Sequence, residues 1–325
     1  MIEMKPIQTI PLKKIDLFDE TFSVNFRPDL QNLRSSIREV GLIQPVLLRE
    51  KGEGYQIISG FRRISVLNEL GVFEVSSRLF EKNKKDESQL FSLCLHENVT
   101  TRGLNSVEKA IALQKLIDLF KVEPSVVIQT YLPLFHLEPN EKILNTYLSL
   151  AQMEDEVKEF VIKEEVSRSN IRKLSALSQE DRKVLIPFLL SLRLGENRLR
   201  EILILLDEVS RRNRKKIAEI IDRSEIQTIL SREELTPSQK TEQVKRFLLE
   251  LRYPRMTELE RDFERRRKDL KLPSNISLSH SPYFEGRQWR IEFRFEKIDD
   301  YRSIISFLSQ LKERKEFEEL LTPPQ

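Results

Sequence analysis

The sequence contains little glycine, cysteine and histidine, and it has no long hydrophobic run. Its single cysteine, Cys94, excludes a disulfide framework and a cysteine-built zinc site. The three histidines lie far apart along the chain, so we do not expect a histidine metal cluster. The longest apolar stretch, residues 184–192, is too short to span a bilayer, and the first residues contain no apolar signal core. We therefore expect a cytoplasmic protein without a membrane partner.

The few glycines are unevenly distributed. There are eight in 325 residues, and five of them fall between positions 41 and 71. Glycine is needed where the backbone has a positive φ or approaches a ligand closely. We therefore expect a functional site in this window and a helix-rich chain elsewhere.

Charge is balanced overall but not along the chain. There are 55 basic and 52 acidic residues, for a net charge of +3. Residues 193–271 contain 21 basic and 16 acidic residues, whereas residues 103–192 contain 11 and 13. A basic stretch can bind phosphates or an acidic partner, so residues 193–271 are the better electrostatic candidate for nucleic acid.

Apolar periodicity predicts an α+β protein in three parts. Residues 1–102 alternate strand and helix patterns and form a small α/β domain. Residues 103–235 are almost wholly helical, and Asn105 and Glu108 have the spacing of a capping pair. A helix–turn–helix fits residues 124–150, with its second helix beginning near Pro139.

The third part, residues 236–325, is a small C-terminal α/β unit with a helix–hairpin–helix order. Residues 289–295 alternate aromatic or aliphatic with charged side chains, which predicts a strand with one buried face. Residues 276–279 are expected to pair with it across a loop at 282–286. Because two strands cannot bury such a face alone, we expect it to pack on its own helices or on a second copy.

One constellation has the chemistry of a nucleotide site. Gly60 ends a predicted strand and opens a helix, where free N–H groups and the positive helix dipole favour an anion. Arg62 and Arg63 add two guanidinium groups at the same place. Glu97 and Asn98 supply the oxygens that magnesium prefers. A magnesium–nucleotide pocket is one interpretation; the other makes the two arginines surface residues and Gly60 a simple turn.

The order and spacing of these residues resemble the N-terminal domain of the ParB partition-protein family, whose fold is shared with sulfiredoxin. The resemblance covers roughly residues 7–115 and rests on four segments. They are GLIQP at 41–45, GFRR at 60–63 for the family's G-E-R-R, ENVTTR at 97–102 for its E-N-x-x-R, and LNSVEKA at 104–110 for its L-N-P-x-E-x-A.

The resemblance implies a domain that binds CTP with Mg²⁺ and closes as a clamp on DNA. By motif position, Gly60, Arg62 and Arg63 hold the phosphates, and Glu97 and Asn98 hold the metal. The implied nucleotide-binding residues also include two from the first motif, Gly41 and Gln44.

Two departures from the family pattern bear on the chemistry. The glutamate of G-E-R-R, which the family ties to hydrolysis, is Phe61 here. A phenyl ring cannot orient water or accept a proton, so at most a weak CTPase activity is expected. The arginine of E-N-x-x-R is displaced by one residue to Arg102, about 100° around a helix.

DNA contacts have two candidate locations. In the helix–turn–helix, Asn140, Lys142 and Asn145, together with Thr146, are able to contact bases, although Glu138 repels phosphates. The second location is the basic stretch after residue 193, with one run that contains Arg211, Arg212, Arg214 and Lys215 and another at residues 265–268. The alternative in both places is a helical scaffold with a solvated charged surface.

The sequence therefore predicts a ParB-like, CTP-dependent DNA-binding protein that acts in chromosome or plasmid partition or in DNA organisation. We expect a homodimer, and a partition ATPase as a further partner. Two alternatives remain open: a nucleotide-hydrolysing or kinase enzyme on the same fold, and a non-catalytic interaction adaptor that has lost DNA recognition.

Overall fold

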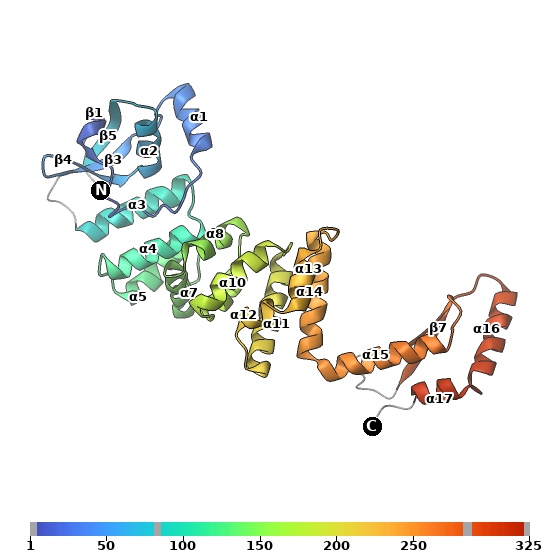
Figure 1. The fold of residues 1–325 in the computed structure, drawn as a ribbon. Helices are drawn as coiled ribbons and strands as arrows, with labels where there is room; N and C mark the ends of the chain where they lie inside the picture. The colour runs from blue at the N-terminus through green and yellow to red at the C-terminus, as the bar shows by residue number, and fades with distance from the viewer. Residues whose placement is uncertain (1–4, 81–85, 282–287, 322–325) are drawn as a thin grey trace. The chain divides into compact units, whose positions relative to one another are not determined.

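The computed structural model describes residues 5–80, 86–281 and 288–321 (Figure 1). The chain divides into two compact units, residues 1–186 and 187–325, each of which is described by itself below. The finer division at residues 102 and 235 stays a prediction. Within the described ranges, no helix has both the length and the apolarity needed to cross a membrane.

The first unit begins with a mixed five-stranded sheet in the order β1-β5-β3-β4-β2. The strands are β1 (Gln8–Pro11), β2 (Ile15–Asp16), β3 (Val46–Lys51), β4 (Gly54–Ser59) and β5 (Glu74–Phe80). Strand β3 runs antiparallel to β4 and parallel to β5. Strand β1 is at an edge and ends at Pro11, as expected because proline cannot donate a ladder hydrogen bond.

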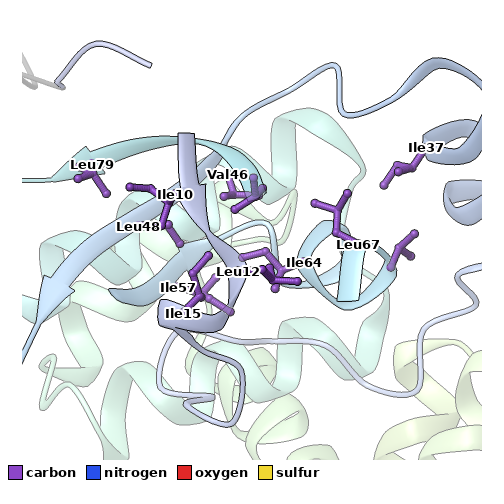
Figure 2. Close-up of a cluster of buried hydrophobic side chains, with 12 residues drawn as sticks. Ile10, Leu12, Ile15, Ile37, Val46, Leu48, Ile57, Ile64, Leu67 and Leu79 are labelled. Atoms are coloured by element: carbon purple, nitrogen blue, oxygen red, sulfur yellow. The ribbon is translucent and has the colours of Figure 1, made fainter. Parts of the chain in front are cut away.

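Short helices pack against this sheet. They are η1 (Leu12–Lys14), α1 (Gln31–Val40), α2 (Phe61–Glu69) and α3 (Glu87–Thr101). Figure 2 shows the core between the sheet and α1 and α2, where Val46 and Leu48 of β3 meet Ile64 and Leu67 of α2. This packing fixes the junction between β4 and α2, on which the candidate site depends.

The rest of the first unit is helical. Its helices are α4 (Ser106–Asp118), α5 (Pro124–Val126), η2 (Val127–Tyr131), α6 (Leu132–Leu134), α7 (Glu141–Ala151), α8 (Asp155–Lys163) and α9 (Arg168–Ser175). The next helix, α10 (Gln179–Leu190), begins in this unit and includes the boundary at residue 186. The predicted capping pair is confirmed. The Asn105 side chain accepts from the Glu108 N–H at 2.9 Å, and the Glu108 carboxylate accepts from the Asn105 N–H at 3.3 Å.

The second unit combines helices with a two-stranded sheet. Its helices are α11 (Glu196–Asn213), α12 (Ile217–Ile221), α13 (Ser224–Ser231), α14 (Pro237–Arg252), α15 (Pro254–Asp269), α16 (Ile298–Leu311) and α17 (Lys315–Leu321). Strands β6 (Ile276–His280) and β7 (Trp289–Phe293) pair antiparallel as predicted. The predicted loop at 282–286 lies outside the described residues. The three-part α+β fold class is confirmed.

The aromatic face of residues 289–295 is less covered than the sequence pattern predicts. Trp289 packs beside Phe263 in the small core of this unit. Strand β7 ends at Phe293, however, and Phe295 is 52% exposed. The Phe293 and Phe295 rings cluster with Tyr301, with centroids 6.3 and 5.2 Å from it. Two strands with contacts to α15 and α16 are too small to cover the whole face.

Candidate functional site

The site is built at the junction of β4 and α2, where the chain turns at Gly60. Gly60 has φ 106° and precedes α2 without a side-chain cap, so the first N–H groups of the helix have no capping side chain. A Cβ at this position would lie 2.7 Å from Cγ1 of the buried Val46. Both the positive φ and this close approach require glycine.

A pocket of about 200 Å³ opens beside this junction, and we call it the Gly60 pocket. Six of the seven nucleotide and metal residues predicted from the sequence line it: Gln44, Gly60, Arg62, Arg63, Glu97 and Asn98. The seventh, Gly41, ends α1 with φ 75° and lines a different hollow beside Ile37 and Leu70. Residues from three separate motifs thus converge on one place.

Arg63 and Glu97 form an ion pair in the pocket. The two side chains lie 2.7 Å apart, and Ser59 donates to the other Glu97 oxygen at 2.6 Å. The same guanidinium donates to the backbone oxygens of Gln44 and Pro45, each at 3.2 Å. Arg63 therefore connects the first motif to the start of α2 and to α3.

Arg62 points to a different carboxylate. Its guanidinium lies 2.5 Å from Glu108, whose side chain is only 1% exposed, and its Nε donates to Asn25 at 3.0 Å. Burial lowers the pKa of Arg62, and the nearby Glu108 opposes that shift. Arg102 lies 2.7 Å from the second Glu108 oxygen, so one buried carboxylate holds two guanidinium groups.

Arg102 also belongs to the pocket, despite its one-residue displacement in the motif. Its Nε donates to the Asn98 side-chain oxygen at 2.8 Å, one helical turn away. Sequence reasoning assigned no role to Asn25, and it identified Glu108 as a capping residue within the LNSVEKA segment but not as a partner of the arginines. The capping-box spacing was a signal for Glu108, but its long-range partners have no local signal.

The remaining wall is apolar. It includes Phe22, Val24, Leu33, Phe61 and Cys94. Phe61 packs against the sheet core. The Cys94 thiol is fully buried and donates to the Phe22 carbonyl at 3.3 Å; burial raises its pKa to about 12. This thiol is therefore a neutral packing group at physiological pH.

This arrangement suits a polyanion bound together with a hard cation. Three guanidinium groups and an uncapped helix start supply positive charge, while Glu97 and Asn98 supply oxygen atoms. The apolar wall offers a surface for a ring or a base.

The helix–turn–helix candidates lie at the start of α7. Asn140 caps this helix, because its side chain accepts from the Lys142 N–H at 2.8 Å. Lys142 and Asn145 are exposed. Thr146 is buried, and its hydroxyl donates to the Lys142 carbonyl at 2.8 Å, so it faces the core.

The basic run lies at the end of α11, in the second unit. Arg211 pairs with Asp207 one turn earlier at 2.9 Å, and Arg212 donates to the Leu251 carbonyl at 3.2 Å. Arg214 has φ 52° and ends the helix, and Lys215 follows it. All four side chains of this run, Arg211, Arg212, Arg214 and Lys215, belong to exposed residues.

With this geometry established, comparison with known proteins identifies the first part of the chain. The family model for the ParB N-terminal domain matches residues 1–99. The predicted resemblance is therefore confirmed over the segment that contains most of the Gly60 pocket.

Longer alignments reach curated bacterial proteins. A probable chromosome-partitioning protein ParB of Campylobacter jejuni is 27% identical over 195 residues, which cover 60% of this chain and 64% of that protein. A nucleoid occlusion protein of Halalkalibacterium halodurans is 28% identical over 151 residues, covering 46% and 50%. The chain thus spans between half and two thirds of these relatives.

Among solved structures, the chain is similar to a C-terminally truncated ParB of Caulobacter crescentus in complex with CTP-gamma-S. The identity is 22%, the TM-score is 0.26, and the match covers 54% of this chain and 94% of that one.

Proposed function

We propose that this protein is a ParB-type, nucleotide-dependent DNA-associated protein that binds CTP with Mg²⁺ and acts in partition or nucleoid organisation. The observation that carries the proposal is the convergence of three motifs on the Gly60 pocket. Under this proposal, the uncapped start of α2 and the Arg63 guanidinium bind phosphate oxygens.

The residues of the pocket fit a magnesium ion. Mg²⁺ uses hard oxygen ligands and keeps several waters and phosphate oxygens, so it needs only one or two protein groups. The Glu97 carboxylate and the Asn98 side-chain oxygen are of this type and line the same pocket. To bind the ion, they would exchange contacts with Arg63, Ser59 and Arg102. When bound, the ion neutralises phosphate charge; Glu97 and Asn98 would hold it.

Phe61 limits the chemistry that follows binding. Its ring packs on the sheet core at the position of the family's acidic residue and has no atom able to accept a proton. We therefore propose binding with at most weak hydrolysis, which favours a switch over an enzyme. This makes the kinase or hydrolase alternative the less supported one.

Calorimetric titration with CTP and Mg²⁺, compared with the other three ribonucleoside triphosphates, tests the nucleotide proposal. Arg63→Ala removes a charge-assisted contact and is expected to weaken CTP binding roughly 10- to 100-fold. Arg211→Ala removes an equivalent charge from the other unit and is expected to leave affinity unchanged. Failure of the unmodified protein to bind any of the four nucleotides would overturn the proposal.

For DNA we propose two contact surfaces, the start of α7 (Asn140, Lys142 and Asn145) and the end of α11 (Arg211, Arg212, Arg214 and Lys215). The exposure of most of these side chains supports this assignment. Binding to random duplex DNA measured over a salt series gives the number of phosphate contacts from the slope. If the slope is unchanged when the four basic side chains at the end of α11 are replaced by glutamine, these side chains do not contact DNA. If the unmodified protein does not bind DNA at all, the adaptor alternative is favoured.

The exposed aromatic cluster around Phe295 supports a homodimer through the C-terminal part of the chain. Sedimentation of the unmodified protein and of Phe295→Ser checks this: the variant is expected to shift toward monomer. A partition ATPase remains the proposed further partner, and co-sedimentation with a purified ATPase of that class tests it.

A further inference from the structure

One wall of the Gly60 pocket is a segment without helix or strand. We call residues 19–25 the wall loop; its Phe22, Val24 and Asn25 line the pocket. Within the segment the Ser23 N–H donates to the Glu20 carbonyl at 3.0 Å, and the rest of its shape depends on contacts with side chains.

The largest of these contacts is made by Lys115 of α4. Its ammonium group donates to the carbonyl oxygens of Glu20 at 2.6 Å, Ser23 at 2.7 Å and Thr21 at 3.4 Å. An ammonium group has three donors and no acceptor, so this one side chain matches three converging carbonyls. The three carbonyl oxygens point toward the ammonium group, as carbonyl oxygens do around a bound cation.

Further contacts complete the wall loop. Asp19 accepts from the Thr21 N–H at 3.0 Å and from Gln56 at 2.7 Å, which fixes the first end. The Cys94 thiol donates to the Phe22 carbonyl. Four consecutive carbonyls, from residue 20 to residue 23, thus have side-chain donors, and three of these depend on Lys115.

Helix α4 reaches the pocket at a second point. Glu108 lies seven residues before Lys115, two helical turns along the same face, and holds Arg62 and Arg102. The wall loop and Glu108 meet at Arg62, whose Nε donates to Asn25. One helix therefore positions both guanidinium groups and the Asn25 amide, whose oxygen accepts from Arg62 at 3.0 Å and from Arg102 at 3.4 Å.

We propose that Lys115 is a positioning residue for nucleotide binding: it holds the wall loop so that Asn25 keeps Arg62 oriented in the Gly60 pocket. This inference rests on the proposed nucleotide function. It assigns a role to a side chain that is not itself in the pocket lining and that lies beyond the matched ParB N-terminal domain.

The test compares Lys115→Met with a matched control on the same helix. Methionine keeps the length and apolar stem but leaves the three carbonyls without the ammonium donor, so affinity for CTP with Mg²⁺ is expected to fall roughly tenfold. Lys109→Met removes another half-buried lysine, which is not among the side chains that donate to the wall loop, and is expected to change affinity less than twofold. Lys115→Arg, which retains several donors, is expected to restore most of the affinity.

A double-mutant cycle separates positioning from general stability. If Lys115 acts through Asn25, then Lys115→Met in an Asn25→Ala background is expected to cause little further loss of affinity. Fully additive losses, or no rescue by Lys115→Arg, would overturn the inference.

Amide hydrogen exchange measured without nucleotide distinguishes failure of the Lys115 inference from failure of the proposed nucleotide function. Amides of residues 20–25 are expected to exchange faster in Lys115→Met than in Lys109→Met. If the unmodified protein binds no nucleotide, the proposed function fails and the ligand part of this inference fails with it. If nucleotide binds and neither affinity nor exchange changes in Lys115→Met, only the Lys115 inference fails.

Discussion

The surroundings of two pairs of adjacent arginines at helix ends, Arg62–Arg63 and Arg211–Arg212, differ. Arg62 and Arg63 at the start of α2 contact carboxylates from α4 and α3, and the Arg63 side chain is 14% exposed. Arg211 at the end of α11 is 78% exposed and pairs with Asp207 of its own helix. Arg212, beside it, donates to backbone carbonyls at the end of α14.

The difference shows that basic residues alone do not define a site. An exposed pair on one helix gains little, because water and salt screen it. Pairs formed between elements in a partly buried pocket interact strongly and leave a costly charge when one partner is removed. What separates the two arginine pairs is therefore the set of groups facing them, which comes from distant parts of the sequence.

Removing a buried partner is the sharpest way to test this difference. Glu108→Gln leaves Arg62 and Arg102 without their shared carboxylate, and we expect a loss of about 3 kcal/mol in the free energy of unfolding. Asp207→Asn removes the partner of Arg211 and is expected to cost less than about 0.5 kcal/mol. Urea unfolding followed by circular dichroism measures both. Equal losses in the two variants would remove the distinction.

The next largest effect is expected at the turn that places the first arginine pair. Gly60→Ala adds a Cβ at φ 106° and 2.7 Å from Val46 Cγ1, so we expect a loss of about 1–3 kcal/mol. Gly195 precedes α11 with φ −80°, and a Cβ added there would meet no described atom within 4 Å, so Gly195→Ala is expected to cost less than about 1 kcal/mol.

Thermal unfolding and CTP titration of both glycine variants provide the measurements. Gly60→Ala should lose nucleotide affinity as well as stability, whereas Gly195→Ala should retain the affinity. If the Gly60→Ala protein is as stable as the unmodified one, the junction tolerates a side chain and the fold does not require glycine at this position.

Local sequence signals predicted much of the fold and the centre of the site. Periodicity located the strands and helices, and the spacing of Asn105 and Glu108 predicted the cap of α4. The glycine window and the Gly60-Phe61-Arg62-Arg63 segment indicated the pocket. These features depend on neighbours within one element or one turn, and such signals are visible in a sequence.

Two contacts of the site were beyond the sequence because they join distant residues. Asn25 contacts Arg62, and Lys115 contacts the wall loop, across 37 and 92 or more positions. Gly41, assigned to the site by its motif, caps α1 instead of lining the pocket. The strand pattern at 289–295 did not indicate whether its own helices or a second copy cover the apolar face, because alternation reports two faces but not what covers them.

The smallest expected difference is at the beginning of the wall loop. Asp19 has a side chain that is 9% exposed and lies 2.6 Å from Lys51, unlike the exposed Asp207. Burial alone would raise the pKa of Asp19, but hydrogen bonds from Lys51, Thr21 and Gln56 together lower it below its usual range. The charged carboxylate is thus favoured in the folded state.

Because the folded-state pKa of Asp19 is lower than the unfolded-state value, its contribution to stability is present above about pH 4 and is lost as the pH falls from there toward the folded-state pKa. Asp19→Asn is expected to cost about 1 kcal/mol at pH 7, since asparagine still accepts some of the hydrogen bonds. The gap between the two proteins should narrow below pH 4 in urea unfolding measured over a pH series. If the difference in unfolding free energy between the two proteins stays constant from pH 7 to pH 3, the charge of Asp19 contributes nothing and the side chain acts through its shape alone. The charged pair at the wall loop would then be as weak as the exposed pair at the end of α11.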